Sequence, residues 1–108
     1  MPKQIFGTPF QQTATHATSA VATQTGVAGT TSYITDICGS SDKAGSLLLI
    51  KDGATIIWQL QLATTAAGIN AFNHSFSTPL KITTGSDCSI TVDGTSACKS
   101  NFAGFTLP

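Results

Sequence analysis

Residues 45–62 read Gly-Ser-Leu-Leu-Leu-Ile-Lys-Asp-Gly-Ala-Thr-Ile-Ile-Trp-Gln-Leu-Gln-Leu, and this stretch decides the class of fold. Two β-type runs flank the pair Asp52-Gly53, which supplies the two positive-φ positions of a tight hairpin. Over residues 56–62, large apolar side chains occupy every second position, which predicts a strand with one buried face. The stretch therefore predicts a β-hairpin, with Trp58 in the core of an all-β fold.

The composition limits what such a fold does. The chain has 108 residues, which is the length of one domain, and its five lysines and five aspartates give a formal net charge of zero. It contains no arginine and no glutamate, and only 9% of its residues are charged. A neutral surface offers no electrostatic footprint for nucleic acid or for an anionic membrane. A surface poor in charge is typical of a domain that lies against other protein.

From residue 30 onward, turn signals separate short β-prone runs at close intervals, as in sandwiches and jelly rolls. The pair Asp93-Gly94 predicts a second tight hairpin near the C-terminus. With a Thr-rich run near the N-terminus added, we expect eight strands, at residues 15–23, 31–38, 46–51, 54–62, 69–76, 80–83, 87–92 and 96–105. This number suits an antiparallel, jelly-roll-like β-sandwich.

The composition changes near residues 26–29, which predicts two parts. Residues 1–26 are expected to form an extended N-terminal arm, with one candidate strand, and residues 27–108 the β-sandwich domain. The first residues show no apolar signal segment, and no run is long enough to span a membrane. Synthesis and assembly in a cytoplasm are therefore expected.

The order of segments along the chain is distinctive: a strand, a Ser/Gly loop, the run at residues 47–53, an aromatic strand, Thr78-Pro79-Leu80 and a closing run at residues 89–92. This layout resembles the small β-sandwich proteins of tailed-bacteriophage virions, and within them the capsid cement (decoration) proteins. The resemblance covers residues 30–105. It implies a jelly-roll-like sandwich without a cofactor, homo-oligomers, usually trimers, and binding to the major capsid protein on the capsid exterior. It also implies a terminal arm that holds the shell.

The residues offer little for catalysis or metal binding. His16 and His74 are the only histidines and have no zinc-ligand spacing with the cysteines. Without glutamate there is no paired-carboxylate site of the usual kind, and the aspartates fall mostly at turns. No serine lies in a Gly-x-Ser-x-Gly elbow. We expect no enzyme, no metal and no cofactor.

The three cysteines are an odd number, so at least one is unpaired within the chain. Cys88 and Cys98 flank the Asp93-Gly94 turn at nearly matching distances. A disulfide between them is allowed if their Cβ atoms come within about 4.5 Å. In a reducing compartment two small buried thiols are the favoured alternative.

Four aromatic residues are the candidate contacts with the capsid or with other subunits: Phe6, Phe10, Phe102 and Phe105. The first two belong to the expected arm. The last two, three residues apart, point to opposite faces of a regular strand, which leaves one of them at a surface. Two alternatives stay open: a phage tail, neck or fibre component, and a carbohydrate-binding module with Trp58 or Phe72 on an open face.

Overall fold

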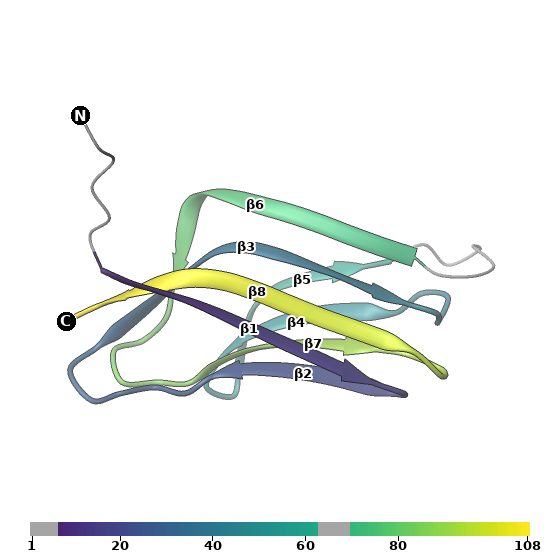
Figure 1. The fold of residues 1–108 in the computed structure, drawn as a ribbon, viewed down its shortest axis with the longest axis horizontal. Coiled ribbons are helices and arrows are strands. Elements are labelled where there is room, and N and C mark those ends of the chain that lie inside the picture. The colour runs from purple at the N-terminus through teal and green to yellow at the C-terminus, as the bar shows by residue number, and fades with distance from the viewer. Residues whose placement is uncertain (1–6, 63–69) are drawn as a thin grey trace.

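The computed structural model describes residues 7–62 and 70–108, which form eight strands and no helix (Figure 1). In chain order the strands are β1 (Thr8–His16), β2 (Ser19–Gln24), β3 (Thr31–Ser41), β4 (Leu47–Asp52), β5 (Thr55–Gln61), β6 (Asn70–Lys81), β7 (Cys88–Asp93) and β8 (Cys98–Leu107).

The strands form two four-stranded antiparallel sheets, ordered β1-β8-β3-β6 and β2-β7-β4-β5. Only β4 and β5 are consecutive strands of the same sheet. Every other pair of consecutive strands is divided between the two layers (Figure 1). This order is that of an eight-stranded jelly roll. The prediction of an all-β, antiparallel, jelly-roll-like sandwich is confirmed.

The core lies between the two layers and follows the two-residue period of the strands. In β7, Cys88, Ile90 and Val92 are buried and alternate with half-buried residues. The largest fully buried apolar side chains are Phe102, Ile34, Ile37, Leu48, Ile50, Ile82, Ile90 and Val92. Burial of each such side chain contributes about 1.5–3 kcal/mol relative to exposure, so this single core holds the two sheets together.

The N-terminal part of the chain differs from the expected arm. From Thr8 to Gln24 it forms β1 and β2, which pair along their whole lengths with β8 and β7. The small side chains in this part offer little apolar surface, but backbone hydrogen bonds to β8 and β7 hold both strands in the sandwich. Ala20 and Ala22 lie in the core. Residues 1–6 of the expected arm lie outside the described residues.

The strand expected at residues 15–23 is broken by a turn at residues 17 and 18. The Nδ1 atom of His16 accepts hydrogen bonds from the backbone N–H groups of Thr18 and Ser19, both at 3.1 Å. These bonds close the turn, after which the chain crosses to the other sheet.

Conversely, the two strands expected at residues 69–76 and 80–83 are parts of one strand, β6. Pro79 is tolerated there because β6 is at the edge of its sheet.

The β4–β5 hairpin is present, but its turn is one residue later than predicted. Asp52 pairs with Thr55, and the two residues between them form the turn. Gly53 has a φ of 61°, whereas no described residue other than glycine has a positive φ. A glycine at the first central position is the requirement of a type II′ turn, not of the type I′ turn that Asp-Gly suggested.

The second predicted hairpin, at Asp93-Gly94, does not form. β7 and β8 belong to different sheets, so this connection carries the chain across the sandwich. The backbone carbonyl of Asp93 accepts hydrogen bonds from the hydroxyls of Ser41 and Ser46. The Gly94 N–H donates to the Thr18 carbonyl at 2.9 Å. These contacts fix a crossing between layers where sequence reasoning placed a tight turn.

Candidate interaction surfaces

Of the large apolar side chains exposed in the described residues, four lie on β5, the outermost strand of the second sheet, and on its neighbour β4. We call this group the β5 patch and define it as Leu47, Ile56, Ile57 and Leu60, which are 41%, 47%, 36% and 39% exposed. In addition, every residue of β5 except Trp58 is exposed. Clustered exposed apolar side chains are typical of a surface that contacts other protein.

A β-bulge explains why sequence reasoning missed this patch. Ile50 pairs with Trp58, but its neighbour Lys51 pairs with Ile56, so Ile57 is an extra residue in β5. The bulge changes the phase of the alternation, and Ile56 lies opposite a lysine rather than opposite a core residue. Leu60 pairs with the fully buried Leu48 but is itself exposed, because β5 is at the edge of its sheet.

Trp58 is half-buried, not fully buried as predicted, and it bridges the two layers. Its ring stacks on His74 at a centroid distance of 5.4 Å and meets the edge of Phe76 at 5.3 Å. Both partners are on β6, the outer strand of the other sheet. This aromatic cluster packs against the core. It joins the two layers at their outer strands β5 and β6.

The four predicted contact residues have different positions. Phe6 lies outside the described residues. Phe10 is half-buried and meets Phe102 edge to face at a centroid distance of 5.6 Å. Phe102 is only 2% exposed, so it is a core residue and not part of the chain's surface. Phe105 is half-buried and stacks on Tyr33 at 5.0 Å with an interplanar angle of 14°. Of the described residues in this set, Phe10 and Phe105 are partly accessible.

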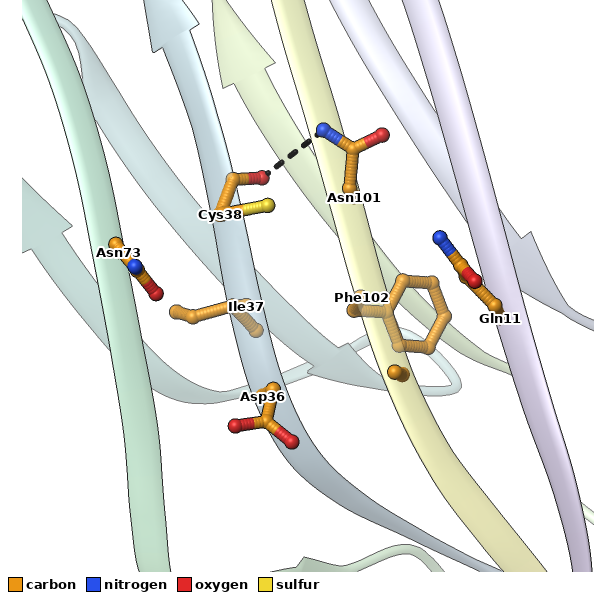
Figure 2. A pocket seen from close by; sticks show the side chains of 8 residues that line it. Gln11, Asp36, Ile37, Cys38, Asn73, Asn101 and Phe102 are labelled. Carbon is orange, nitrogen blue, oxygen red and sulfur yellow. Dashed lines mark hydrogen bonds between the residues drawn. The ribbon is translucent and has the colours of Figure 1, made fainter.

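The outer face of the first sheet contains a shallow hollow of about 90 Å³ (Figure 2). It is lined by residues of all four strands of that sheet, including Gln11, Cys38, Asn73 and Asn101. The Asn101 Nδ2 atom donates to the Cys38 carbonyl at 3.3 Å. Neutral amides dominate its polar rim, and Asp36 at its lower end is held by Ser75 and Thr35. These hydrogen bonds lower the pKa of Asp36, so it stays ionised and is a poor proton donor.

The other carboxylates with hydrogen bonds hold loops together. Asp52 accepts from the N–H and hydroxyl of Thr83 at 3.0 and 2.7 Å. Asp87 accepts from the Gly26 N–H at 2.6 Å. Asp42 accepts from the N–H groups of Thr95 and Ser96. Each of these carboxylates connects segments distant in sequence, which is a structural role.

The three cysteines are free. The hypothetical Cys88–Cys98 disulfide is not formed: Cys88 begins β7, whereas Cys98 begins β8 and follows the far end of β7. Cys88 lies opposite Gln24 and Cys98 opposite His16. Burial is the main cause that raises the pKa of the Cys88 thiol to about 12, and the negative charges of Asp52 and Asp87 add to it.

Within residues 7–62 and 70–108, no three His, Cys, Asp or Glu side chains are grouped so as to hold a metal ion. The same part of the chain has no helix long and apolar enough to cross a membrane.

No protein-family model and no curated protein matches the chain. Among solved structures, it is similar to part of the insecticidal delta-endotoxin Cry8Ea1 from Bacillus thuringiensis, with 16% identity and a TM-score of 0.46. That match covers 86% of this chain, which spans only 18% of the toxin chain. The chain is also similar to a protein of the virus-like particle of extra small virus from the giant freshwater prawn Macrobrachium rosenbergii. There the identity is 10%, the TM-score is 0.36, and 100% of this chain and 84% of that chain are covered. The assignment of this chain to the eight-stranded β-sandwiches rests on its own strand order.

Proposed function

We propose that the chain is a non-enzymatic structural protein of a virus particle. More specifically, it acts as a cement (decoration) protein that binds the outside of a tailed-phage capsid and stabilises contacts between major capsid subunits. It works by binding alone, needs no cofactor, and assembles with copies of itself. The number of copies in one assembly, three according to the layout resemblance, stays a prediction.

The observation that carries the proposal is the β5 patch on a surface with very few charges. Four large apolar side chains of one hairpin are 36–47% exposed, in a chain with only 9% charged residues. A soluble domain that acts alone on small molecules gains nothing from such a surface, which favours aggregation. A domain that is permanently packed against other protein gains interface area from it.

The chemistry of the described residues supports a binding role. The two histidines serve a turn and an aromatic cluster, and three aspartates hold loops. The buried Cys88 thiol has a raised pKa and is therefore a weak nucleophile. A nucleophile with an adjacent base would indicate an enzyme, but these histidine and aspartate side chains serve the structural contacts just named.

The same fold serves a tail, neck or fibre component equally well, because a fold does not define a function. The carbohydrate-binding alternative depended on Trp58 or Phe72 on an open face. Phe72 is only 9% exposed, and Trp58 is half-buried and engaged in ring contacts with His74 and Phe76, which disfavours both as platforms on which a sugar stacks.

The proposal is tested by immunogold electron microscopy of the phage particles, with antibodies raised against the purified chain. We expect dense labelling over the whole capsid exterior, in a copy number comparable with that of the capsid subunits. Labelling confined to the tail or neck would support the rival location. Particles that carry no label, while free protein in the lysate is detected by the same serum, would contradict a virion role. Serum pre-absorbed with the purified chain is the control.

A further inference from the structure

We infer that the corner between β1 and β2, residues 16–19, is a pH-sensitive latch, closed while the His16 imidazole is neutral and released when the imidazole takes up a proton. The corner is the point at which the chain passes from the first sheet to the second. The latch is a property of the fold itself, so it goes beyond the proposed function and does not depend on it.

The corner is closed by the histidine side chain. The Nδ1 atom of His16 accepts hydrogen bonds from the backbone N–H groups of Thr18 and Ser19, both at 3.1 Å. A ring nitrogen that accepts hydrogen bonds carries no proton, so the neutral ring holds its proton on Nε2. In the usual turns of this kind, a short Asp, Asn, Ser or Thr side chain is the acceptor. In this corner the acceptor is a type of side chain that changes its charge near neutral pH.

Protonation removes this acceptor. In the imidazolium both ring nitrogens are donors, so Nδ1–H would point at the two backbone N–H groups and repel them. The ring must then turn away, and the N–H groups of Thr18 and Ser19 lose their protein partner. Both hydrogen bonds are exposed, so water can replace the imidazole. The expected change is therefore a local opening of the corner, and not an unfolding of the domain.

Other contacts keep the surrounding strands in place when the corner opens. The Thr18 carbonyl accepts from the Gly94 N–H at 2.9 Å, and the His16 carbonyl accepts from the Cys98 thiol at 3.3 Å. Both contacts attach the corner to the β7–β8 crossing and to the start of β8. Neither involves the imidazole, so its protonation leaves them intact. The latch thus acts on the corner alone, while β1 and β2 stay paired with β8 and β7.

Other titratable groups belong to the segments packed around the corner. β8 contributes Cys98 and Lys99, β7 contributes Asp93, and the segment after β3, which is bonded to the β7–β8 crossing, contributes Asp42 and Lys43. As classes, carboxylates take up protons near about pH 4, and thiols and lysines lose theirs above about pH 8. Histidine changes its charge between about pH 5 and pH 8. The imidazole is therefore the group that makes the corner sensitive in this range, closed at its upper end and open at its lower end.

The inference is tested by NMR spectroscopy of the isotopically labelled full chain. At about pH 8, long-range proton–nitrogen correlation spectra should show the neutral His16 ring with its proton on Nε2. Magnetisation transfer from water then measures how fast the N–H groups of Thr18 and Ser19 exchange as the pH is lowered to about 5. After correction for the intrinsic pH dependence of amide exchange, they should exchange about two- to tenfold faster once His16 is protonated, the factor that corresponds to one net hydrogen bond. The ring signals of His16 in the same samples report its protonation.

His16→Asn is the matched variant, because its amide oxygen accepts hydrogen bonds at every pH. It should keep the two N–H groups protected over the same pH range. His16→Phe keeps a planar ring without an acceptor and should leave them unprotected throughout. His74→Phe removes the other histidine and should behave like the wild type.

A neutral His16 ring with its proton on Nδ1 would overturn the inference. So would corrected exchange of the Thr18 and Ser19 N–H groups that does not change as His16 is protonated, or a His16→Asn variant that keeps the wild-type pH dependence. The first two measurements need only the wild-type chain, so they decide the matter even if a variant does not fold. None of them uses particles, so the result is independent of whether the chain is found on a capsid.

Discussion

At the scale of single residues, burial separates the three cysteines. Cys38 is exposed on the outer face of the first sheet, beside the hollow of Figure 2, whereas Cys88 and Cys98 are each 1% exposed. The Cys98 thiol donates to the His16 carbonyl at 3.3 Å. Cys88 is surrounded by core and has two aspartates nearby, so its thiolate is disfavoured at any ordinary pH. Access therefore favours Cys38 as the reactive thiol, and the raised pKa of Cys88 adds to the protection of that buried thiol.

We predict that the native chain has one rapidly reacting thiol. With a disulfide reagent such as dithionitrobenzoate near pH 8, Cys38 should react quickly, and Cys88 and Cys98 should react only as fast as the protein opens. Addition of guanidinium should release all three thiols. The Cys38→Ser variant is the control and should lack the rapid phase. Two or more rapid thiols in the wild-type chain would show that the core around Cys88 or Cys98 opens easily.

At the scale of elements, a single carboxylate connects two loops. Asp42 follows β3, and its carboxylate accepts hydrogen bonds from Thr95 N–H at 2.8 Å and from Ser96 N–H at 2.9 Å. The Ser96 hydroxyl donates to the same group. The hydrogen bond from this hydroxyl and those from the two N–H groups hold the pKa of Asp42 well below its usual range. The β7–β8 crossing is thus attached to the end of β3.

We predict that Asp42→Asn destabilises the fold in a pH-dependent way. Because the folded-state pKa of Asp42 is lowered, its contribution is fully present above the unfolded-state pKa of about 3.9 and is lost as the pH falls through the folded-state pKa. Thermal unfolding should show a lower midpoint for the variant at pH 7. The difference from wild type should narrow below about pH 4.

Asp93→Asn is the control for this experiment. It removes the same charge near the same crossing, but Asp93 contributes its backbone carbonyl to the described hydrogen bonds with Ser41 and Ser46. Its midpoint should stay close to that of the wild type at both pH values. An Asp42→Asn variant whose deficit is equal at pH 7 and pH 3 would show that the loss is not caused by the carboxylate's charge.

At the scale of the whole molecule, the N-terminal strands are part of both sheets. β1 lies beside β8 along its full length (Figure 1), and β2 contributes Ala20 and Ala22 to the core. Their removal would uncover β8 and β7 and the side chains beneath them, including Phe102 and Ile90. Loss of one large core side chain alone costs about 3–5 kcal/mol, a large part of the roughly 5–15 kcal/mol of an ordinary domain.

We therefore predict different outcomes for two truncations. Deletion of residues 1–24 should abolish cooperative unfolding, measured by circular dichroism and calorimetry. Deletion of residues 1–6 keeps all eight strands and should unfold close to the wild-type midpoint. If Phe6 anchors the chain to the capsid, the shorter truncation should also bind particles more weakly in co-sedimentation. Wild-type binding by this folded variant would rule out an anchoring role for Phe6.

Much of this architecture could be predicted from local sequence. The Gly45–Leu62 stretch indicated the hairpin, and the spacing of turn signals indicated eight short strands in a sandwich, because two-residue alternation and turn chemistry are local properties. The errors arose where pairing is not local. One expected strand is two, two expected strands are one, and the Asp93-Gly94 turn is a crossing between sheets.

The sequence by itself determined the fold class, the single domain without net charge, and the β4–β5 hairpin. Only the tertiary structure decided which residues are surface. Phe102, a candidate contact, is core because β8 is a central strand, whereas Ile56 and Leu60 are exposed because β5 is an outer strand with a bulge. The physical reason is that alternation specifies the two faces of a strand, but only the order of strands in the sheets specifies what covers each face.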